Sequence, residues 1–142
     1  MLLQVYIDGA ARGNPGPAGI GVVIKKGAQV LAEISDFIGK ATNNVAEYLA
    51  LIRGLEEALA LGATKVECFS DSELLVKQIK GEYQVKNEGL TPLYYHACAL
   101  IKKFKTFTLS HTLRQENKHA DQLANQGIDQ HALKGSPLFD KM

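Results

Sequence analysis

The N-terminal third of the chain alternates between short hydrophobic segments and turn-forming residues. Leu3–Asp8 is rich in β-forming residues and ends on a carboxylate, and Ile20–Ile24 is a mostly β-branched run. Between them, the glycine- and proline-rich stretch Gly9–Gly19 predicts a loop. A turn at Lys25–Ala28 and an alternating segment at Val30–Ile38 predict a hairpin, so we expect a three-stranded antiparallel meander.

The hydrophobic pattern changes to helical spacing after Thr42. Apolar residues recur at helical intervals from Val45 to Leu59, Thr42 or Asn43 suits the N-cap, and Gly62 suits the C-terminal end. The remaining elements that we predict are a buried strand at Lys65–Ser70 followed directly by Asp71, helices at Ser72–Ile79 and from Pro92, a strand at Thr106–Thr112, and a last helix from about Asn117 to Gln126.

A meander followed by alternating helices and strands predicts an α/β fold. We expect a mixed five-stranded sheet, with the three-strand antiparallel meander plus two parallel strands, flanked by helices. No repeat or linker divides the 142 residues, so we expect one domain over residues 1–127. The polar stretch after Gly127 predicts a C-terminal tail over residues 128–142.

The composition is that of an ordinary globular protein and argues against several other classes. No apolar run approaches the ~20 residues that span a bilayer, and the N-terminus lacks the features of a signal peptide, so we expect no membrane association and a cytoplasmic location. The formal net charge of +1 does not favour nucleic-acid binding through bulk electrostatics. Cys68 and Cys98 stand among apolar residues, which predicts buried free thiols rather than a disulfide framework.

Four acidic residues stand where the predicted elements can bring them together. Asp8 ends the first strand, and Asp71 follows the fourth; if these strands are parallel neighbours, both side chains emerge at one edge of the sheet. Glu47 lies one turn into the first helix and Asp121 lies early in the last one, so both can pack over that edge. Taken singly, each acid also fits a turn, an N-cap or a solvated helix position.

A cluster of four carboxylates has a specific chemical use. Such groups repel one another unless they are protonated or neutralised by cations. Oxygen-rich sites without cysteine suit Mg²⁺ or Mn²⁺. Two such ions about 4 Å apart can activate a water and stabilise the leaving oxygen of a phosphodiester.

Four segments resemble those of type 1 ribonucleases H, and they occur in the same order along the chain. They are Tyr6–Gly9 with Gly13–Gly19, Thr42–Tyr48 (TNNVAEY), Ser70–Ser72 (SDS) and Glu116–Asn125 (ENKHADQLAN). The resemblance covers residues 1–127 and implies the ribonuclease H-like fold. It also implies a metal-dependent endonuclease that hydrolyses the RNA strand of RNA–DNA hybrids and leaves 5′-phosphate and 3′-hydroxyl ends.

The same resemblance implies the site residues. Two Mg²⁺ ions, or Mn²⁺ as a substitute, would be held by the catalytic acids Asp8, Glu47, Asp71 and Asp121. The substrate-binding residues would be Gly9, Asn14, Asn43 and Asn44 at the minor groove of the hybrid, where 2′-hydroxyls distinguish RNA from DNA, and Thr42 at a phosphate of the DNA strand. From their residue types alone, the glycine loop is also a plain turn and the asparagines are also helix caps.

The chain departs from many family members in two places. The long loop with a histidine before the last acid is short here, so His111 is expected in the preceding strand, and Arg114 is our candidate for stabilising phosphate charge or assisting product release. A solvated loop arginine is the competing interpretation, and for His119 we expect a surface role. The basic protrusion that many members carry after the second helix, rich in Lys and Trp, is also missing. The aromatic side chain that stacks on a DNA sugar in the family is either absent here or supplied by Tyr83.

Two other interpretations of the sequence stay open. The first is a module that binds hybrids or double-stranded RNA without cutting them, which the four intact acids disfavour. The second is a domain detached from a reverse transcriptase, whereas a Met just before the first strand favours a free-standing protein. We expect a monomer whose partner is an RNA–DNA hybrid.

Overall fold

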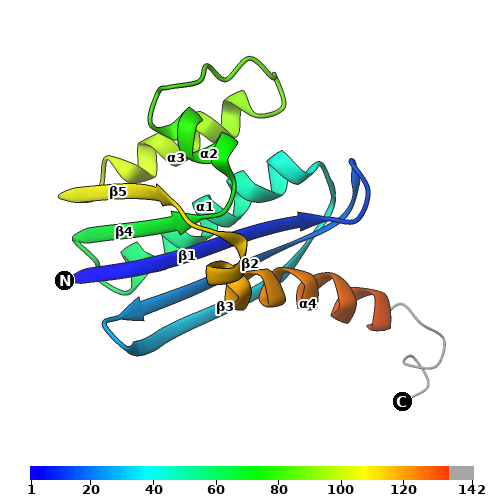
Figure 1. Cartoon of the computed structure of the whole chain (residues 1–142), viewed down its shortest axis with the longest axis horizontal. Helices are drawn as coiled ribbons and strands as arrows, with labels where there is room; N and C mark the ends of the chain where they lie inside the picture. Colours follow the sequence, from blue (N-terminus) through cyan, green and yellow to red (C-terminus); the bar gives the residue numbers. More distant parts are fainter. Residues whose placement is uncertain (135–142) are drawn as a thin grey trace.

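The structure, a computed structural model, describes residues 1–134 and consists of a five-stranded sheet with helices on both faces (Figure 1). The strands are β1 (Leu2–Ala11), β2 (Gly16–Lys26), β3 (Gln29–Ala41), β4 (Lys65–Ser70) and β5 (Thr106–His111). The helices are α1 (Asn43–Ala60), α2 (Glu73–Ile79), α3 (Thr91–Ile101), the 3₁₀ helix η1 (Arg114–Asn117) and α4 (Lys118–Lys134).

The sheet has the mixed topology that the order of elements predicts. Its strand order is β3-β2-β1-β4-β5. The first three strands are antiparallel neighbours, whereas β1 with β4 and β4 with β5 are parallel pairs. The mixed five-stranded α/β fold expected from the sequence is therefore confirmed.

The main core lies between the sheet and the helices α1 and α3. Leu3, Val5 and Ile7 alternate along β1 and are completely buried on this side. Burial of each such side chain contributes roughly 1.5–3 kcal/mol. On the opposite face α4 packs through a much smaller cluster, centred on Val23 and Leu123. Figure 1 shows α1 behind the sheet and α4 in front of it.

The glycine- and proline-rich stretch after Asp8 is mostly strand, so the loop predicted over Gly9–Gly19 was wrong. Strand β1 continues to Ala11 and β2 begins at Gly16, with Gly9 paired to Ile20. Two of these glycines serve another purpose, because helices approach the sheet closely there. A Cβ at Gly9 would overlap the backbone of Ala46 in α1, and one at Gly19 would overlap the backbone of Ala124 in α4.

The last helix is longer than predicted. It continues to Lys134, past Gly127, whereas the sequence pattern predicts its end at about Gln126. Gly127 is instead a point of close approach, because a Cβ there would lie 2.8 Å from the backbone of Asp36 in β3. Ile128, the first residue of the predicted tail, is buried. The rest of that tail, residues 135–142, lies outside the described residues.

The N-cap of α1 and the free cysteines predicted from the sequence are confirmed. Thr42 is the N-cap of α1, and its side chain accepts a hydrogen bond from the backbone N–H of Val45 at 3.2 Å. Both cysteines are free; Cys68 is fully buried and Cys98 partly buried. Within residues 1–134, none of the helices combines the length and apolar character that crossing a bilayer requires.

Candidate active site

The site forms where the parallel pairing of β1 and β4 stops. The last paired residues are Ile7 and Ser70, so the next residue of each strand, Asp8 and Asp71, leaves the ladder at the same level. Strand β4 ends there, whereas β1 continues. The backbone N–H of Ser72 donates to the Ser70 hydroxyl at 3.0 Å, which fixes the turn that carries Asp71.

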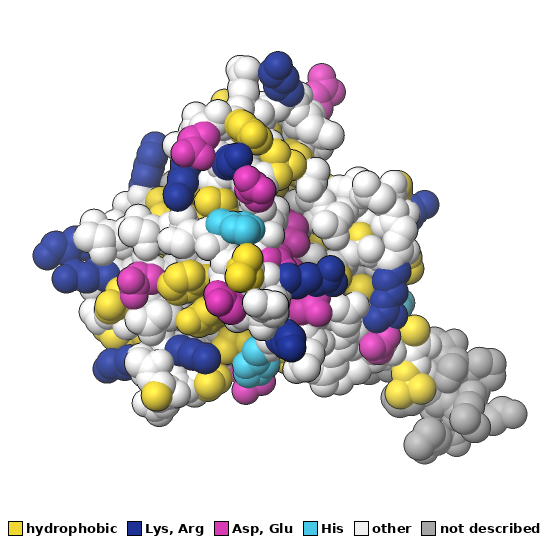
Figure 2. Space-filling model, viewed as in Figure 1, with side chains coloured by type: hydrophobic (Ala, Val, Ile, Leu, Met, Phe, Trp, Pro, Cys, Tyr) yellow, Lys and Arg dark blue, Asp and Glu magenta, His cyan; other side chains and the backbone are white. Residues whose placement is uncertain are grey.

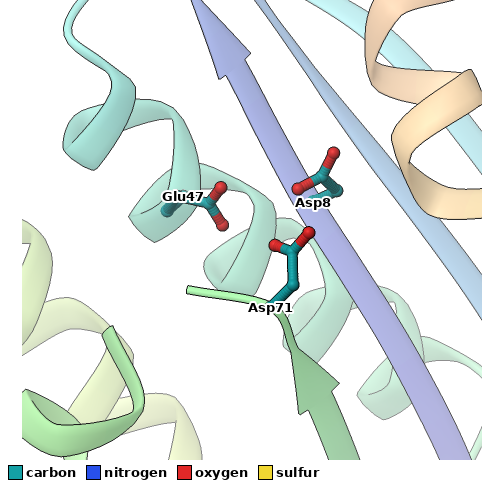
Figure 3. Close-up of side chains that lie close together, drawn as sticks. All are labelled: Asp8, Glu47 and Asp71. Carbon is teal, nitrogen blue, oxygen red and sulfur yellow. The ribbon is translucent and has the colours of Figure 1, made fainter. Parts of the chain in front are cut away.

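Glu47 completes a group of three carboxylates. It projects from the second turn of α1, which lies against β1 because Gly9 leaves room for the helix backbone. One oxygen from each of Asp8, Glu47 and Asp71 lies within 4.8 Å of the other two, and Figure 3 shows the three side chains pointing toward one another. Three acids far apart in sequence are thus brought together as the sequence predicted.

Asp121 reaches the site from α4, on the other side of the sheet. It lines the same cleft of about 390 Å³ as the other three acids. It is not a member of the group whose oxygens lie within 4.8 Å of one another. Asn117, fully buried just before α4, donates to the backbone carbonyl of Ile7 at 2.8 Å and so ties this helix to β1 beside Asp8.

The environment of the acids opposes negative charge. Burial, followed by repulsion from Glu47, raises the pKa of Asp8 to about 10. Burial, followed by repulsion from Asp71, raises the pKa of Glu47 to about 8, although the backbone N–H of Gly9 partly offsets this. Carboxylates gathered in this way need either protons or cations to be stable.

The donor set fits a hard divalent cation. Glu47 is 4% exposed, and its Oε2 is buried without a hydrogen-bond partner. A buried carboxylate oxygen without a partner is costly, and a bound ion would supply one. The ligands are carboxylates alone, which is the chemistry that Mg²⁺, Mn²⁺ and Ca²⁺ prefer.

Two of the five predicted substrate-binding residues line this cleft, and the other three lie next to one of them in sequence or by hydrogen bond. Gly9 and Asn43 line it directly. The exposed Asn14 accepts a hydrogen bond from the backbone N–H of Asn43 at 3.1 Å, which joins the β1–β2 turn to the start of α1. Thr42 and the exposed Asn44 flank Asn43 at the same helix end but are not among the lining residues.

The structure also shows where the arginine and the two histidines discussed from the sequence lie. Arg114 lines the cleft from η1, with Nη2 3.9 Å from Asp121 Oδ1, and its side chain is 79% exposed. His111 is the last residue of β5, and His119 lies on the surface against Glu33, as predicted. Only Thr112, Leu113 and η1 separate β5 from α4, so the connection is as short as the sequence indicates.

The residues lining the cleft that sequence reasoning did not assign to the site include Arg12 and Asn125. Arg12 lies in the turn after β1, and Asn125 lies one helical turn after Asp121. The spacing of four residues between Asp121 and Asn125 was the signal that could have found the second of them.

Several known proteins resemble this chain in both sequence and fold. A family model described as reverse transcriptase-like matches residues 6–127. A crystal structure of ribonuclease H1 from Halobacterium salinarum superposes with a TM-score of 0.89 at 40% identity, covering 92% of this chain and 99% of that one. A ribonuclease H1 isolated from compost, LC11, crystallised with an RNA/DNA hybrid, gives a TM-score of 0.87 at 42% identity and covers 92% and 99% of the two chains.

The chain belongs to the ribonuclease H family. A further relative is a bifunctional protein of Mycobacterium tuberculosis, which is 45% identical over 91% of this chain. The chain spans only 36% of the length of that relative, and 64% of the length of the ribonuclease HI of H. salinarum.

Proposed function

We propose that this protein hydrolyses the RNA strand of RNA–DNA hybrids as a metal-dependent endonuclease. The observation that carries the proposal is the convergence of Asp8, Glu47 and Asp71 in a cleft that Asp121 also lines. The hybrid-bound structure of the compost ribonuclease H1, similar in fold and sequence, supports the choice of substrate.

In this proposal Asp8, Glu47, Asp71 and Asp121 hold two Mg²⁺ ions, with Mn²⁺ as a substitute. When bound, the ions supply Lewis-acid activation of a water and neutralise charge on the phosphate. The protein's own contribution is to hold the acids rigidly. Close packing of α1 on Gly9 places Glu47, the turn at Ser70 orients Asp71, and Asn117 fixes α4 beside β1.

The rim of the cleft would select the substrate. Gly9, Asn14, Asn43 and Asn44 offer uncharged donors and acceptors to 2′-hydroxyl groups, which only the RNA strand carries. Thr42 would meet a phosphate of the DNA strand at the N-terminus of α1, where the positive end of the helix dipole favours an anion. Because these contacts read the sugar rather than the bases, we expect little sequence preference.

Arg114 would stabilise phosphate charge or assist departure of the product. Its guanidinium lies at the mouth of the cleft beside Asp121 and is largely exposed, so it can move toward a bound strand. We expect Arg114→Ala to lower kcat about tenfold, below the range for a buried oxyanion donor because solvent weakens the interaction. Lys118→Ala, at the exposed first residue of α4, is the control, and unchanged turnover in Arg114→Ala would refute the role.

The function itself is tested by cleavage of an end-labelled RNA–DNA hybrid. We expect the wild-type protein to cut only the RNA strand, only with Mg²⁺ or Mn²⁺, and to leave duplex DNA intact. Asp8→Asn removes one metal ligand without changing side-chain size and should abolish cleavage. Glu56→Gln, on the exposed side of α1, is the matched control and should cut like the wild type.

The same experiment separates the competing function. A wild-type protein that retains the hybrid in a gel-shift assay but never cuts it, at any metal concentration, would be a binding module. Cleavage by Asp8→Asn at the wild-type rate would show that the acidic cluster is not the catalytic centre.

A further inference from the structure

Asp121 is the acid that the fold positions least directly. Asp8 and Asp71 leave adjacent strands at one level, whereas Asp121 arrives from a helix on the opposite face of the sheet. It must hold its orientation against repulsion from neighbouring acids, because Asp8 and Glu47 both experience its charge. A side chain in this situation needs an external hydrogen bond to select its rotamer.

Asn125 supplies such a bond. It lies one turn after Asp121 on α4, and its Nδ2 donates to the backbone carbonyl of Asp121 at 3.0 Å and to Asp121 Oδ1 at 3.4 Å. An amide has one donating and one accepting end, so this contact requires the Asn125 Oδ1 to face away from Asp121.

Arg12 determines which way the amide faces. Its Nη2 donates to Asn125 Oδ1 at 3.3 Å. A guanidinium carries donors alone, so it can bind only the oxygen end of the amide and thereby directs the NH₂ end toward Asp121. Asp121 Oδ1 already lies 3.9 Å from Arg114 Nη2, and the amide of Asn125 transmits orientation from Arg12 without placing a second guanidinium at Asp121.

Asp129 holds Arg12 in place. The Arg12 Nη1 lies 2.6 Å from Asp129 Oδ1, and this pairing lowers the pKa of the Asp129 carboxyl. Asp121, Asn125 and Asp129 follow one another at intervals of four residues, so they form a row along one side of α4. Arg12 crosses to that row from the turn that follows β1.

We propose that Asn125 is a positioning residue for Asp121, and that Arg12, anchored by Asp129, fixes the direction of its amide. This relay (Asp129, Arg12, Asn125, Asp121) links the β1–β2 turn to a metal ligand. The inference rests on the proposed function, since it assigns Asp121 a part in holding the cation.

The test measures Mg²⁺ binding in two ways with Asn125→Ala, Asn125→Leu and Gln126→Ala. Leucine keeps the branching of asparagine and is larger, so it leaves no cavity, and a defect shared by both Asn125 variants comes from the lost amide. Gln126, exposed on the same helix, is the matched control. The readouts are the Mg²⁺ concentration giving half-maximal cleavage at saturating hybrid, and the Mg²⁺ concentration giving half of the rise in Tm without nucleic acid.

We expect both Mg²⁺ midpoints to rise about tenfold in the two Asn125 variants, the lower end of the range for residues that orient metal ligands. The Tm without metal should match that of Gln126→Ala, which separates positioning from stability. Midpoints equal to those of the control in both variants would overturn the inference. If the wild-type protein neither cleaves the hybrid nor gains Tm with Mg²⁺, the proposed function fails instead.

The role of Arg12 is tested by a double-mutant cycle on the Tm readout. Arg12→Met should raise the Mg²⁺ midpoint in the wild-type background and have no further effect in Asn125→Leu, because the relay is already broken there. Equal effects of Arg12→Met in both backgrounds would show that Arg12 acts independently of Asn125. Because this measurement contains no nucleic acid, a direct contact between Arg12 and the hybrid cannot contribute to the result.

Discussion

Asp8 and Glu47 are the residues whose surroundings least favour their charged forms. Both are 4% exposed, and both have a pKa raised by burial and by neighbouring acids. A fold optimised for stability alone would place apolar side chains here. The cost is the usual signature of a functional site, where groups are held in readiness for a ligand.

This cost predicts that Asp8→Asn stabilises the protein in the absence of metal. In EDTA at pH 8 we expect a gain in the free energy of unfolding of about 1–2 kcal/mol. An acid whose folded pKa is raised binds more protons in the native than in the unfolded state, so wild-type stability falls as pH rises from about 4 toward 8. The gain should therefore shrink as pH is lowered to 4, measured by urea unfolding at each pH.

Mg²⁺ should make the wild type more stable than Asp8→Asn, the reverse of the order in EDTA. A cation that binds only the native state raises the Tm of the wild type, and Asp8→Asn should gain far less. Glu56→Gln should behave like the wild type in both buffers. A variant at Asp8 that is less stable than the wild type in EDTA at pH 8 would contradict the account of the cluster given above.

Thr42 combines two roles that one substitution can separate. Its hydroxyl caps α1, and we propose that it also meets a phosphate of the DNA strand. Thr42→Asp retains an N-cap worth about 1 kcal/mol but places a negative charge against the phosphate. We expect unchanged Tm with a several-fold higher KM for the hybrid, measured with Thr42→Ser as control. A KM equal to that of the control would leave Thr42 as a helix cap alone.

At the scale of elements, glycine determines how closely the helices approach the sheet. Gly9 lies beneath α1, while Gly21 and Gly127 permit the approach of α4 to β2 and β3. These contacts set the height of both helices above the strands. The distances among the acids therefore depend on residues that have no side chain.

We expect Gly9→Ala to damage the site through this packing. The new methyl group would overlap the backbone of Ala46 and push α1, with Glu47, away from Asp8. Stability should fall by about 1–3 kcal/mol, and a displacement of about 1 Å can lower the cleavage rate about a hundredfold. The control is Gly89→Ala, whose methyl group meets only the Asn87 side chain, at 3.1 Å. Wild-type activity in Gly9→Ala would show that α1 tolerates the shift.

The sequence predicted the order and type of the elements well, because hydrophobic period and capping residues are local signals. The boundaries failed where tertiary contacts changed the meaning of glycine. The stretch after Asp8 and the position of Gly127 both look like turns in sequence, yet they are points of close packing. Arg12 and Asn125 were missed for a similar reason, since their partnership spans most of the chain and has no local pattern.

At the scale of the whole molecule, charge is dispersed rather than concentrated. Figure 2 shows acidic side chains in the middle of one face with basic ones beside them, and Lys and Arg scattered over the rest of that face. The net charge is only +1. Binding of a polyanion should therefore depend on a few local contacts and on the cation rather than on a broad positive field.

Salt dependence of hybrid cleavage tests this view. We expect the logarithm of KM to rise with the logarithm of KCl concentration with a slope of about 3 or less, which corresponds to few released counterions. Replacing Glu82 and Glu88 by Lys, in the segment between α2 and α3, should steepen the slope and lower KM several-fold at low salt. A slope in the wild type as steep as in that variant would indicate a basic surface that the charge distribution does not reveal.

The small apolar cluster beneath α4 has a consequence for the lifetime of the protein in a cell. This helix is attached by far less buried hydrocarbon than α1, yet it carries one of the four acids. A divalent ion held between α1 and α4 would then connect the helices on the two faces of the sheet. Without that ion the protein would lose activity, and α4 would also detach from the sheet more often and become accessible to proteases. The supply of the metal would therefore determine the amount of the protein as well as its activity.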